Sequence, residues 1–302
     1  MYNYSVIIPH HNCPDLLRRL IDSIPDRKDI QVIVVDDASD PSVVDFSNYS
    51  FPDNKIIEFY QISKEDSKWG GHARNVGIEH ATGKWLLFAD SDDFYTEKAF
   101  DVLDRYIESD NDVVYFNCKS VNSKTLEPAD RTNFINNVID NYLKNPCKEY
   151  LDQLKYNSHE PWNKLVSNRF ITKYRIRFEE VKKANDILFT FMVGHFTQTT
   201  VVEPDYVYVC TYRDESVTYS INKVEYAERK LEFGLSKNYF FKHNSLDYLA
   251  ESDFVNFLRI LKSVPIKDWM KFLFVIIRDQ NLIRRNKKKY VNSAIEIQQR
   301  VS

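Results

Sequence analysis

The sequence has few cysteines and no long apolar run, and both shortages narrow the classes of protein to which it can belong. Its four cysteines are scattered without a Cys-x-x-Cys pair, which excludes an obvious zinc site and gives no disulfide framework. No apolar stretch approaches the roughly 20 residues that a membrane span needs. The apolar run at residues 6–8 is too short for a signal peptide. We therefore expect a soluble, cytoplasmic protein.

The chain also lacks the basic surplus that nucleic-acid binding usually requires. Its formal net charge is −3, which argues against a nucleic-acid partner. The charge is uneven, because residues 250–302 carry 11 Lys or Arg against 5 Asp or Glu, a balance of +6 that leaves −9 for the remainder. We expect an acidic body with a basic tail.

Glycine is scarce, and its placement is informative. The chain holds only six glycines, and four of them (Gly70, Gly71, Gly77 and Gly83) fall within fourteen residues. Gly70 and Gly71 stand just before a predicted helix, where free backbone amides could meet an anion, and Arg74 one turn later could meet a phosphate or a base carbonyl. Neither G-x-G-x-x-G nor G-x-x-x-x-G-K-[ST] occurs, so the sequence has no dinucleotide fingerprint and no P-loop.

Strand and helix signals alternate over the first hundred residues, which predicts an α/β fold with a mostly parallel sheet and crossover helices. From about residue 220 onward the pattern is helical, so we expect a larger domain at residues 1–215 and a helical C-terminal appendage at residues 216–302. The predicted strands are residues 5–9, 31–35, 55–62, 84–89, 112–116, 199–203 and 206–211, and the predicted helices of the larger domain are residues 14–24, 73–81 and 97–107, with a mostly helical, polar stretch at 130–200.

Two of the predicted strands run directly into clusters of acidic residues. One is followed by Asp36 and Asp37, and the other by Asp90, Asp92 and Asp93. In open α/β sheets, ligands bind at the carboxyl ends of the strands, where both clusters would lie. Clustered carboxylates repel one another unless a cation or hydrogen-bond donors offset the charge, and Mg²⁺ typically takes one or two carboxylates together with substrate phosphates. The pattern favours a metal-bridged diphosphate; the alternative is that these acids only cap helices and turns.

Several segments together resemble the family 2 glycosyltransferases with the GT-A fold, which is Rossmann-like. They are SVIIPHHN, VIVVDDASD and GGHARNVGIEHATGKWLLFADSDD in the amino-terminal half, followed by PWNKL, ANDILFTF and YRDESVT. The similarity extends over about residues 4–219 and is strongest to enzymes that build bacterial capsule, exopolysaccharide or lipopolysaccharide O-chains. It implies an inverting transferase that moves a sugar from a nucleotide-diphosphate donor, usually UDP-linked, to a glycan or lipid-linked acceptor.

The resemblance also implies a nucleotide-binding role for five residues. Pro9, Asn12 and Asp37 would line the pocket for the base, with Asp37 accepting a hydrogen bond from the base or ribose. Arg74 would reach the base or the diphosphate, and Asp90 would hold the ribose.

The metal and the general base follow from the same resemblance. Asp92 would ligate Mn²⁺ or Mg²⁺ bound to the diphosphate, with Asp93 behind it. Asp186 would be the general base that accepts the acceptor proton. Asp186 could instead be only a helix N-cap, and the sequence does not separate it from Glu179 or Glu180.

The chain departs from the family pattern at two places. His10 and His11 replace the usual small or apolar residue and Tyr, and two histidines on a loop are more often merely solvated. Asn185 stands where the family commonly has Glu, which puts the local charge tuning of Asp186 in doubt.

Three other functions remain open on the sequence. A sugar-nucleotidyltransferase would carry a Gly-rich, Arg/Lys-containing loop after the first strand, which this chain lacks. A catalytically silent nucleotide-sugar-binding module is disfavoured by the two acid clusters and Asp186. A receiver-type phosphoacceptor domain would leave most of the chain unexplained.

The tail predicts an amphipathic helix with an apolar face followed by basic residues. Such a helix could lie on an anionic membrane surface, where lipid-linked acceptors occur. The alternative is that this face packs on the larger domain or on another copy of the chain. The residues concerned are Trp269, Phe272, Leu273, Ile276 and Ile277, followed by Arg284, Arg285 and Lys287 to Lys289.

Overall fold

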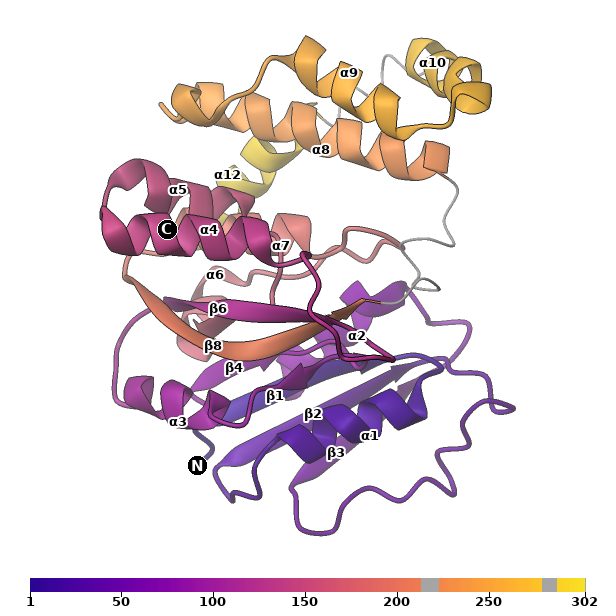
Figure 1. The fold of residues 1–302 in the computed structure, drawn as a ribbon, viewed down its shortest axis with the longest axis vertical. Helices are drawn as coiled ribbons and strands as arrows, with labels where there is room; N and C mark the ends of the chain where they lie inside the picture. Colours follow the sequence, from indigo (N-terminus) through magenta and orange to yellow (C-terminus); the bar gives the residue numbers. More distant parts are fainter. Residues whose placement is uncertain (213–222, 279–286, 302) are drawn as a thin grey trace. The chain divides into compact units, whose positions relative to one another are not determined.

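The computed structural model describes residues 1–212, 223–278 and 287–301 (Figure 1). The chain folds as two compact units, Met1–Arg213 and Asp214–Ser302. The segment YRDESVT, apart from its first residue Tyr212, lies outside the described residues.

Unit 1 is built around one sheet with the strand order β3-β2-β1-β4-β7-β6-β8-β5. The half formed by β3, β2, β1 and β4 is entirely parallel, as predicted. β7 runs antiparallel to both β4 and β6, whereas β6 and β8 are parallel. The expected mostly parallel α/β fold is therefore confirmed. The strands are β1 (Tyr4–His10), β2 (Ile30–Asp37), β3 (Ile57–Ile62), β4 (Trp85–Phe88), β5 (Phe94–Tyr95), β6 (Val113–Asn122), β7 (Lys164–Ser167) and β8 (Thr200–Tyr212).

Helices cover both faces of this sheet, which is why its central strands consist of nearly continuous apolar residues. Val6 and Ile8 share a buried cluster with the apolar face of α1, whereas Ile7, on the opposite face, lies against Gly77 of α2. A Cβ atom at Gly77 would lie 2.3 Å from the Ile7 side chain, so glycine lets α2 approach the strand closely. The helices of unit 1 are α1 (Pro14–Ser23), α2 (Trp69–His80), α3 (Ala99–Leu103), α4 (Asn133–Lys144), α5 (Lys148–Asn157), α6 (Asn168–Tyr174) and α7 (Ile187–Phe196).

Several predicted boundaries were wrong, for identifiable physical reasons. Residues 199–203 and 206–211 form one strand, β8, because the ladder to β6 continues across an irregularity that contains Pro204, which has no N–H to donate. The helix expected at residues 97–107 stops at Leu103 and ends in a 3₁₀ turn. The strand β7 falls in a stretch that we expected to be mostly helical, and β5, which pairs with β8, is too short to give a periodic signal.

Unit 2 is helical, as the sequence predicted. A small apolar cluster lies at its centre, formed by α8, α9 and α10. None of the helices in the described part of the chain combines the length and the apolar character that a bilayer crossing requires. The elements are α8 (Lys223–His243), η2 (Asp247–Leu249), α9 (Asp253–Ser263), η3 (Ile266–Asp268), α10 (Trp269–Arg278) and α12 (Lys289–Val301).

Part of the amphipathic face predicted in the tail packs inside unit 2. Phe272 is fully buried, and the Trp269 indole N–H donates to the Val264 carbonyl at 2.9 Å. On the other side of α10, Met270 and Phe274 are 76% and 62% exposed. The side chains of Ile276, Ile277, Arg284 and Arg285 lie outside the described residues.

Candidate active site

The carboxyl ends of β1 and β2 are joined by a buried ion pair. His10 Nδ1 lies 2.9 Å from Asp36 Oδ1, and both side chains are fully buried. Burial opposes the charged form of Asp36, but hydrogen bonds from His10 and Ser39 outweigh it and lower the pKa of Asp36. The expectation that His10 is solvated was therefore wrong, whereas His11 is exposed.

His10 is held by the same network. Burial lowers its pKa, but the hydrogen bond to Asp36 opposes this, and together with the neighbouring Cys13 it raises the pKa of His10 to about 9. The backbone N–H of Cys13, 3.2 Å from Nε2, suits only the neutral ring. The Nδ1–H···Asp36 hydrogen bond forms with either the neutral or the protonated ring. We therefore treat this bond, and not the charge of His10, as the side-chain contact that joins β1 to β2.

Asp37, the residue after Asp36, is not part of this pair. Its side chain is 6% exposed, and its buried Oδ1 accepts no hydrogen bond from the described residues. An unsatisfied buried acceptor is costly unless a ligand supplies the donor. Asn12, on the neighbouring loop, accepts from the Asp40 N–H at 2.7 Å and so ties the loop after β1 to the loop after β2. Pro9 is half-buried in β1, in register with Val35.

Arg74 connects the acid cluster of β4 to the segment before α7. Its side chain is 9% exposed; Nη2 lies 2.5 Å from Asp90 Oδ1, and Nη1 donates to Asn185 Oδ1 at 2.9 Å. The guanidinium also lies 5.3 Å from the ring centre of Phe178. Asn185, the departure from the family pattern, thus accepts a hydrogen bond from the same arginine that pairs with Asp90.

We expected the glycine pair to precede the helix, but α2 begins at Trp69 and therefore includes both glycines. Gly70 and Gly71 lie in its first turn. A Cβ atom at Gly71 would lie 2.0 Å from the Glu179 carbonyl oxygen, so glycine here allows the segment that carries Asn185 and Asp186 to reach Arg74.

Asp92 and Asp93 follow β4 and differ in burial. Asp93 is 2% exposed and accepts the Thr211 N–H at 2.7 Å; burial and its acidic neighbours Asp92 and Asp90 hold its pKa well above the usual range. Asp92 is half-buried, and its backbone carbonyl accepts from the Thr211 hydroxyl at 2.7 Å.

The described residues contain no group of three His, Cys, Asp or Glu side chains that could hold a metal ion alone. A divalent cation that takes one or two carboxylates and completes its shell with diphosphate oxygens and water fits this arrangement. A resident metal caged by protein ligands does not.

Asp186 stands at the start of α7, where it was expected to be either a base or a cap. Its side chain makes no capping hydrogen bond. Burial raises its pKa to about 6; Arg74 opposes this, and the charges of Asp90 and Glu160 add to it. A carboxylate with a pKa near neutrality suits proton transfer.

The competing carboxylate Glu180 is already engaged at the surface. It pairs with Lys68 at 2.9 Å and with His72 at 3.1 Å. Glu180 is therefore held by two basic side chains at the surface, whereas the choice between Asp186 and Glu179 as acid–base group stays a prediction.

Sequence reasoning missed residues that support this edge of the sheet. The Tyr208 hydroxyl accepts the Asp90 N–H at 2.9 Å, and Trp162 stacks on Tyr208 with ring centres 5.3 Å apart and planes 12° apart. Trp162 lies in the PWNKL segment, which we had matched to the family without giving any residue a role. Only the tertiary pairing of β7 and β8 with β6 brings these rings together.

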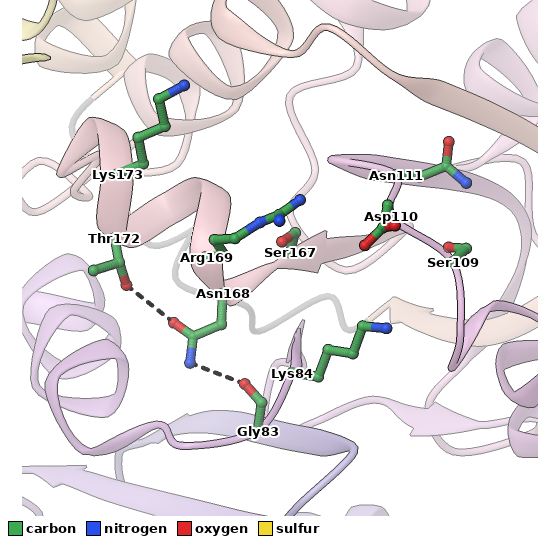
Figure 2. Close-up of a pocket in the computed structure, with 10 residues that line it drawn as sticks. All are labelled: Gly83, Lys84, Ser109, Asp110, Asn111, Ser167, Asn168, Arg169, Thr172 and Lys173. Atoms are coloured by element: carbon green, nitrogen blue, oxygen red, sulfur yellow. Dashed lines mark hydrogen bonds between the residues drawn. The ribbon is translucent and has the colours of Figure 1, made fainter.

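A cavity of about 600 Å³ lies away from these residues (Figure 2). It is lined by residues that precede β4 and β6 and by α6. It therefore lies at the amino-terminal ends of β4 and β6, whereas the acid clusters lie at the carboxyl ends of β2 and β4. Lys84, Arg169 and Lys173 share it with Asp110. We assign it no part in the chemistry below.

The parallel sheet with acids at the carboxyl ends of β2 and β4 defines a GT-A type α/β protein. The family model described as Glycosyl transferase family 2 matches residues 5–196, so the chain belongs to that family. Membership of this family argues against the nucleotidyltransferase and receiver-type alternatives.

Named relatives give the family context. EpsH of Bacillus subtilis is 24% identical over 203 residues, covering 65% of this chain and 56% of its own. The poly(ribitol-phosphate) beta-N-acetylglucosaminyltransferase TarS of Staphylococcus aureus is 28% identical over 209 residues, covering 63% of this chain and 32% of its own. The chain therefore spans about half of the first relative and about a third of the second.

Solved structures share the fold. The crystal structure of S. aureus TarS 1–349 in complex with UDP-GlcNAc aligns with a TM-score of 0.57 at 19% identity, covering 97% of this chain and 92% of that one. The mannosyltransferase PcManGT from Pyrobaculum calidifontis in complex with GDP-Man and Mn²⁺ aligns with a TM-score of 0.56 at 14% identity, covering 97% and 86%.

Proposed function

We propose that this protein is a glycosyltransferase that moves a sugar, with inversion, from a UDP-sugar to a hydroxyl of a glycan or lipid-linked acceptor during surface-polysaccharide synthesis. The observation that carries the proposal is the meeting of Arg74, Asp90 and the Asn185–Asp186 segment at the strand edge where Asp37 also lies. The relatives EpsH and TarS, and the UDP-GlcNAc complex of TarS, support the choice of reaction and donor.

The donor nucleotide would lie across the carboxyl ends of β2, β1 and β4. Asp37 offers the buried acceptor that an N–H of uracil requires. Asp37 is the last residue of β2 and Asp90 follows β4, with β1 between them, so the two strand ends are separated by two strand spacings, roughly 10 Å. Asn12 keeps the two intervening loops together. A nucleoside can span that distance, with Asp90 at the ribose and Arg74 beside it.

The transfer itself needs a proton acceptor on the side of the acceptor hydroxyl. The hydroxyl O–H bond breaks, and its proton passes to Asp186. The oxygen forms a bond to the anomeric carbon, while the bond from that carbon to the diphosphate breaks and its electron pair leaves with the diphosphate. The raised pKa of Asp186 matches this role because the carboxylate gains basicity yet remains ionised above pH 6.

The proposal includes Mn²⁺ or Mg²⁺ as cofactor. Asp92 would hold the ion together with the donor diphosphate, and the ion would act as a Lewis acid that stabilises negative charge on the leaving group. The Mn²⁺ complex of PcManGT supports the choice of metal. Arg74 adds a fixed positive charge at the same edge.

The second unit would contribute the acceptor contact, a subunit contact or a membrane-surface contact on the cytoplasmic side. We propose residues 1–215 as the catalytic domain and residues 216–302 as this accessory region. Liposome flotation with and without anionic lipid would test the membrane contact, and absence of lipid dependence would exclude it.

A thermal-shift screen of nucleotide sugars with Mn²⁺ tests the donor proposal. A ligand that binds only the folded state at 100 times its dissociation constant adds about 2.7 kcal/mol to stability. We expect UDP-sugars to raise the melting temperature in the presence of Mn²⁺ more than without it. Equal shifts with and without Mn²⁺ would contradict the metal, and no shift with any nucleotide sugar would contradict the donor.

A further inference from the structure

A fully buried lysine lies behind the candidate base and has no part in the reaction proposed above. Lys164, the first residue of β7, is 1% exposed. Its Nζ donates to the Ser158 carbonyl at 3.2 Å, to Ser158 Oγ at 2.8 Å and to Asn163 Oδ1 at 2.7 Å, and it also donates to the Glu160 carbonyl. All these acceptors belong to residues 158–163, so the amino group of one side chain, whose pKa burial lowers to about 7, holds a single loop in shape.

Both sides of this loop contact the candidate active site. On one side Trp162 stacks on Tyr208, which holds the Asp90 N–H. On the other side the Thr190 hydroxyl of α7 lies 3.0 Å from the Asp186 carbonyl oxygen and 3.4 Å from the His159 carbonyl oxygen, so the loop meets the start of α7. A loop that a buried amino group holds and that contacts both neighbours keeps its side chains in a fixed position relative to Asp186.

Glu160 is the charged side chain that this loop carries. It is half-buried, and its carboxylate accepts no hydrogen bond from the described part of the chain. The neighbouring His159 carbonyl and the Asp186 carbonyl both lie within 3.4 Å of the Thr190 hydroxyl, and the charge of Glu160 adds to the raised pKa of Asp186. An ionised carboxylate held beside another is unfavourable unless a donor group lies between them.

We propose that the loop of residues 158–162 is the acceptor side of the site, with Glu160 receiving a hydroxyl of the acceptor sugar next to Asp186 and Lys164 acting as the positioning residue. This assignment rests on the proposed function. A sugar ring presents neighbouring hydroxyls, so two carboxylates side by side can accept from two of them at once. One hydroxyl gives up its proton to Asp186, and Glu160 orients the ring.

Glu160→Gln is the variant best suited to test this, because it removes only the charge of a side chain with no described hydrogen-bond partner. The matched control is Glu97→Gln, an exposed glutamate in unit 1. UDP release from UDP-GlcNAc with Mn²⁺ would be measured alone and with a panel of octyl glycosides of glucose, galactose, N-acetylglucosamine and N-acetylgalactosamine. Donor binding would be followed separately by thermal shift.

We expect Glu160→Gln to raise the KM for the active glycoside by about tenfold or more, as for loss of a hydrogen bond to a charged group. UDP-GlcNAc binding and glycoside-independent release should match wild type and the control. The acid limb of the rate profile should also move to lower pH, because the charge that raises the Asp186 pKa is gone.

Lys164→Met supplies a second measurement through the same loop. We expect it to raise the glycoside KM as well, and the double variant with Glu160→Gln should lose less than the product of the two single effects, since both act through one position.

Three results would overturn the assignment. They are an unchanged glycoside KM in Glu160→Gln, an equal loss of donor binding in that variant, and wild-type UDP release that none of the glycosides accelerates. Failure of the wild-type protein to bind any UDP-sugar of the thermal-shift screen would instead contradict the proposed donor, so the two failures are distinguishable.

Discussion

Two groups of acidic residues near the carboxyl ends of the strands differ in how their charges are balanced. At the ends of β1 and β2, His10 and Asp36 form a closed, fully buried pair, and the pKa of Asp36 falls. At the end of β4 and the start of α7, burial and acidic neighbours raise the pKa of Asp93 and of Asp186. A paired charge stabilises the framework, whereas a carboxylate kept short of partners is available to a substrate.

Asp186→Asn should have the largest effect on activity. It removes the proton acceptor while keeping the size of the side chain, so sugar transfer should fall by about 10²- to 10⁴-fold. UDP affinity should stay nearly unchanged, because the proposed donor contacts lie elsewhere. Steady-state kinetics with calorimetry of UDP binding would check both, with Asp101→Asn, an exposed residue of α3, as control. Normal turnover would remove Asp186 from the mechanism.

His10→Ala should have the largest effect on stability. It leaves the buried Asp36 carboxylate with hydrogen bonds from Ser39 but none from His10, and a lost partner of a buried polar group costs about 1–3 kcal/mol. Urea unfolding would measure the loss, and His243→Ala, an exposed histidine of unit 2, should change stability little. Equal behaviour of the two variants would show that the buried pair is not part of the framework.

Asp92→Ala should act on the donor rather than on the fold. We expect it to abolish the metal-dependent part of UDP binding, because the diphosphate would lose the side chain proposed to share its cation. Calorimetry with UDP in the presence and absence of Mn²⁺ separates the two contributions. Mn²⁺-dependent binding equal to wild type would exclude Asp92 as a ligand.

The pH dependence of stability and of the transfer rate should show the smallest effect. With a folded-state pKa of about 6 against an ordinary value of 3.8, Asp186 binds an extra proton in the folded state between these values, so its contribution to stability falls as pH rises through that window. Transfer should change in the opposite sense and rise through pH 6 as the base ionises. Asn185→Asp, which adds a carboxylate beside Asp186, should move this limb to higher pH; a limb that stays in place would show that Asp186 does not set it.

The sequence predicted the strands and their acidic ends better than it predicted which side chains contact one another. Apolar strands ending in acids located β2 and β4 and the edge at which they meet, because this signal is local. The buried state of His10 was not predictable, since nothing near it in the sequence shows that Asp36 will lie in register beside it. The same holds for Lys164 and Tyr208, whose surroundings are assembled only when β7 and β8 join the sheet.

At Asn185 the sequence suggested a loss that the structure does not show. As a departure from the family pattern it suggested lost charge tuning, yet in the structure it binds Arg74, which opposes the rise in the Asp186 pKa. A substitution that looked like a defect keeps the arginine in place.

A crystal structure of the protein soaked with UDP and Mn²⁺ tests the central claim most directly, that this strand edge holds a nucleotide diphosphate. We predict that uracil N3–H donates to Asp37 Oδ1 and that the diphosphate and Mn²⁺ lie against Asp92. UDP bound away from the carboxyl ends of β2 and β4, or with its base remote from Asp37, would contradict the account.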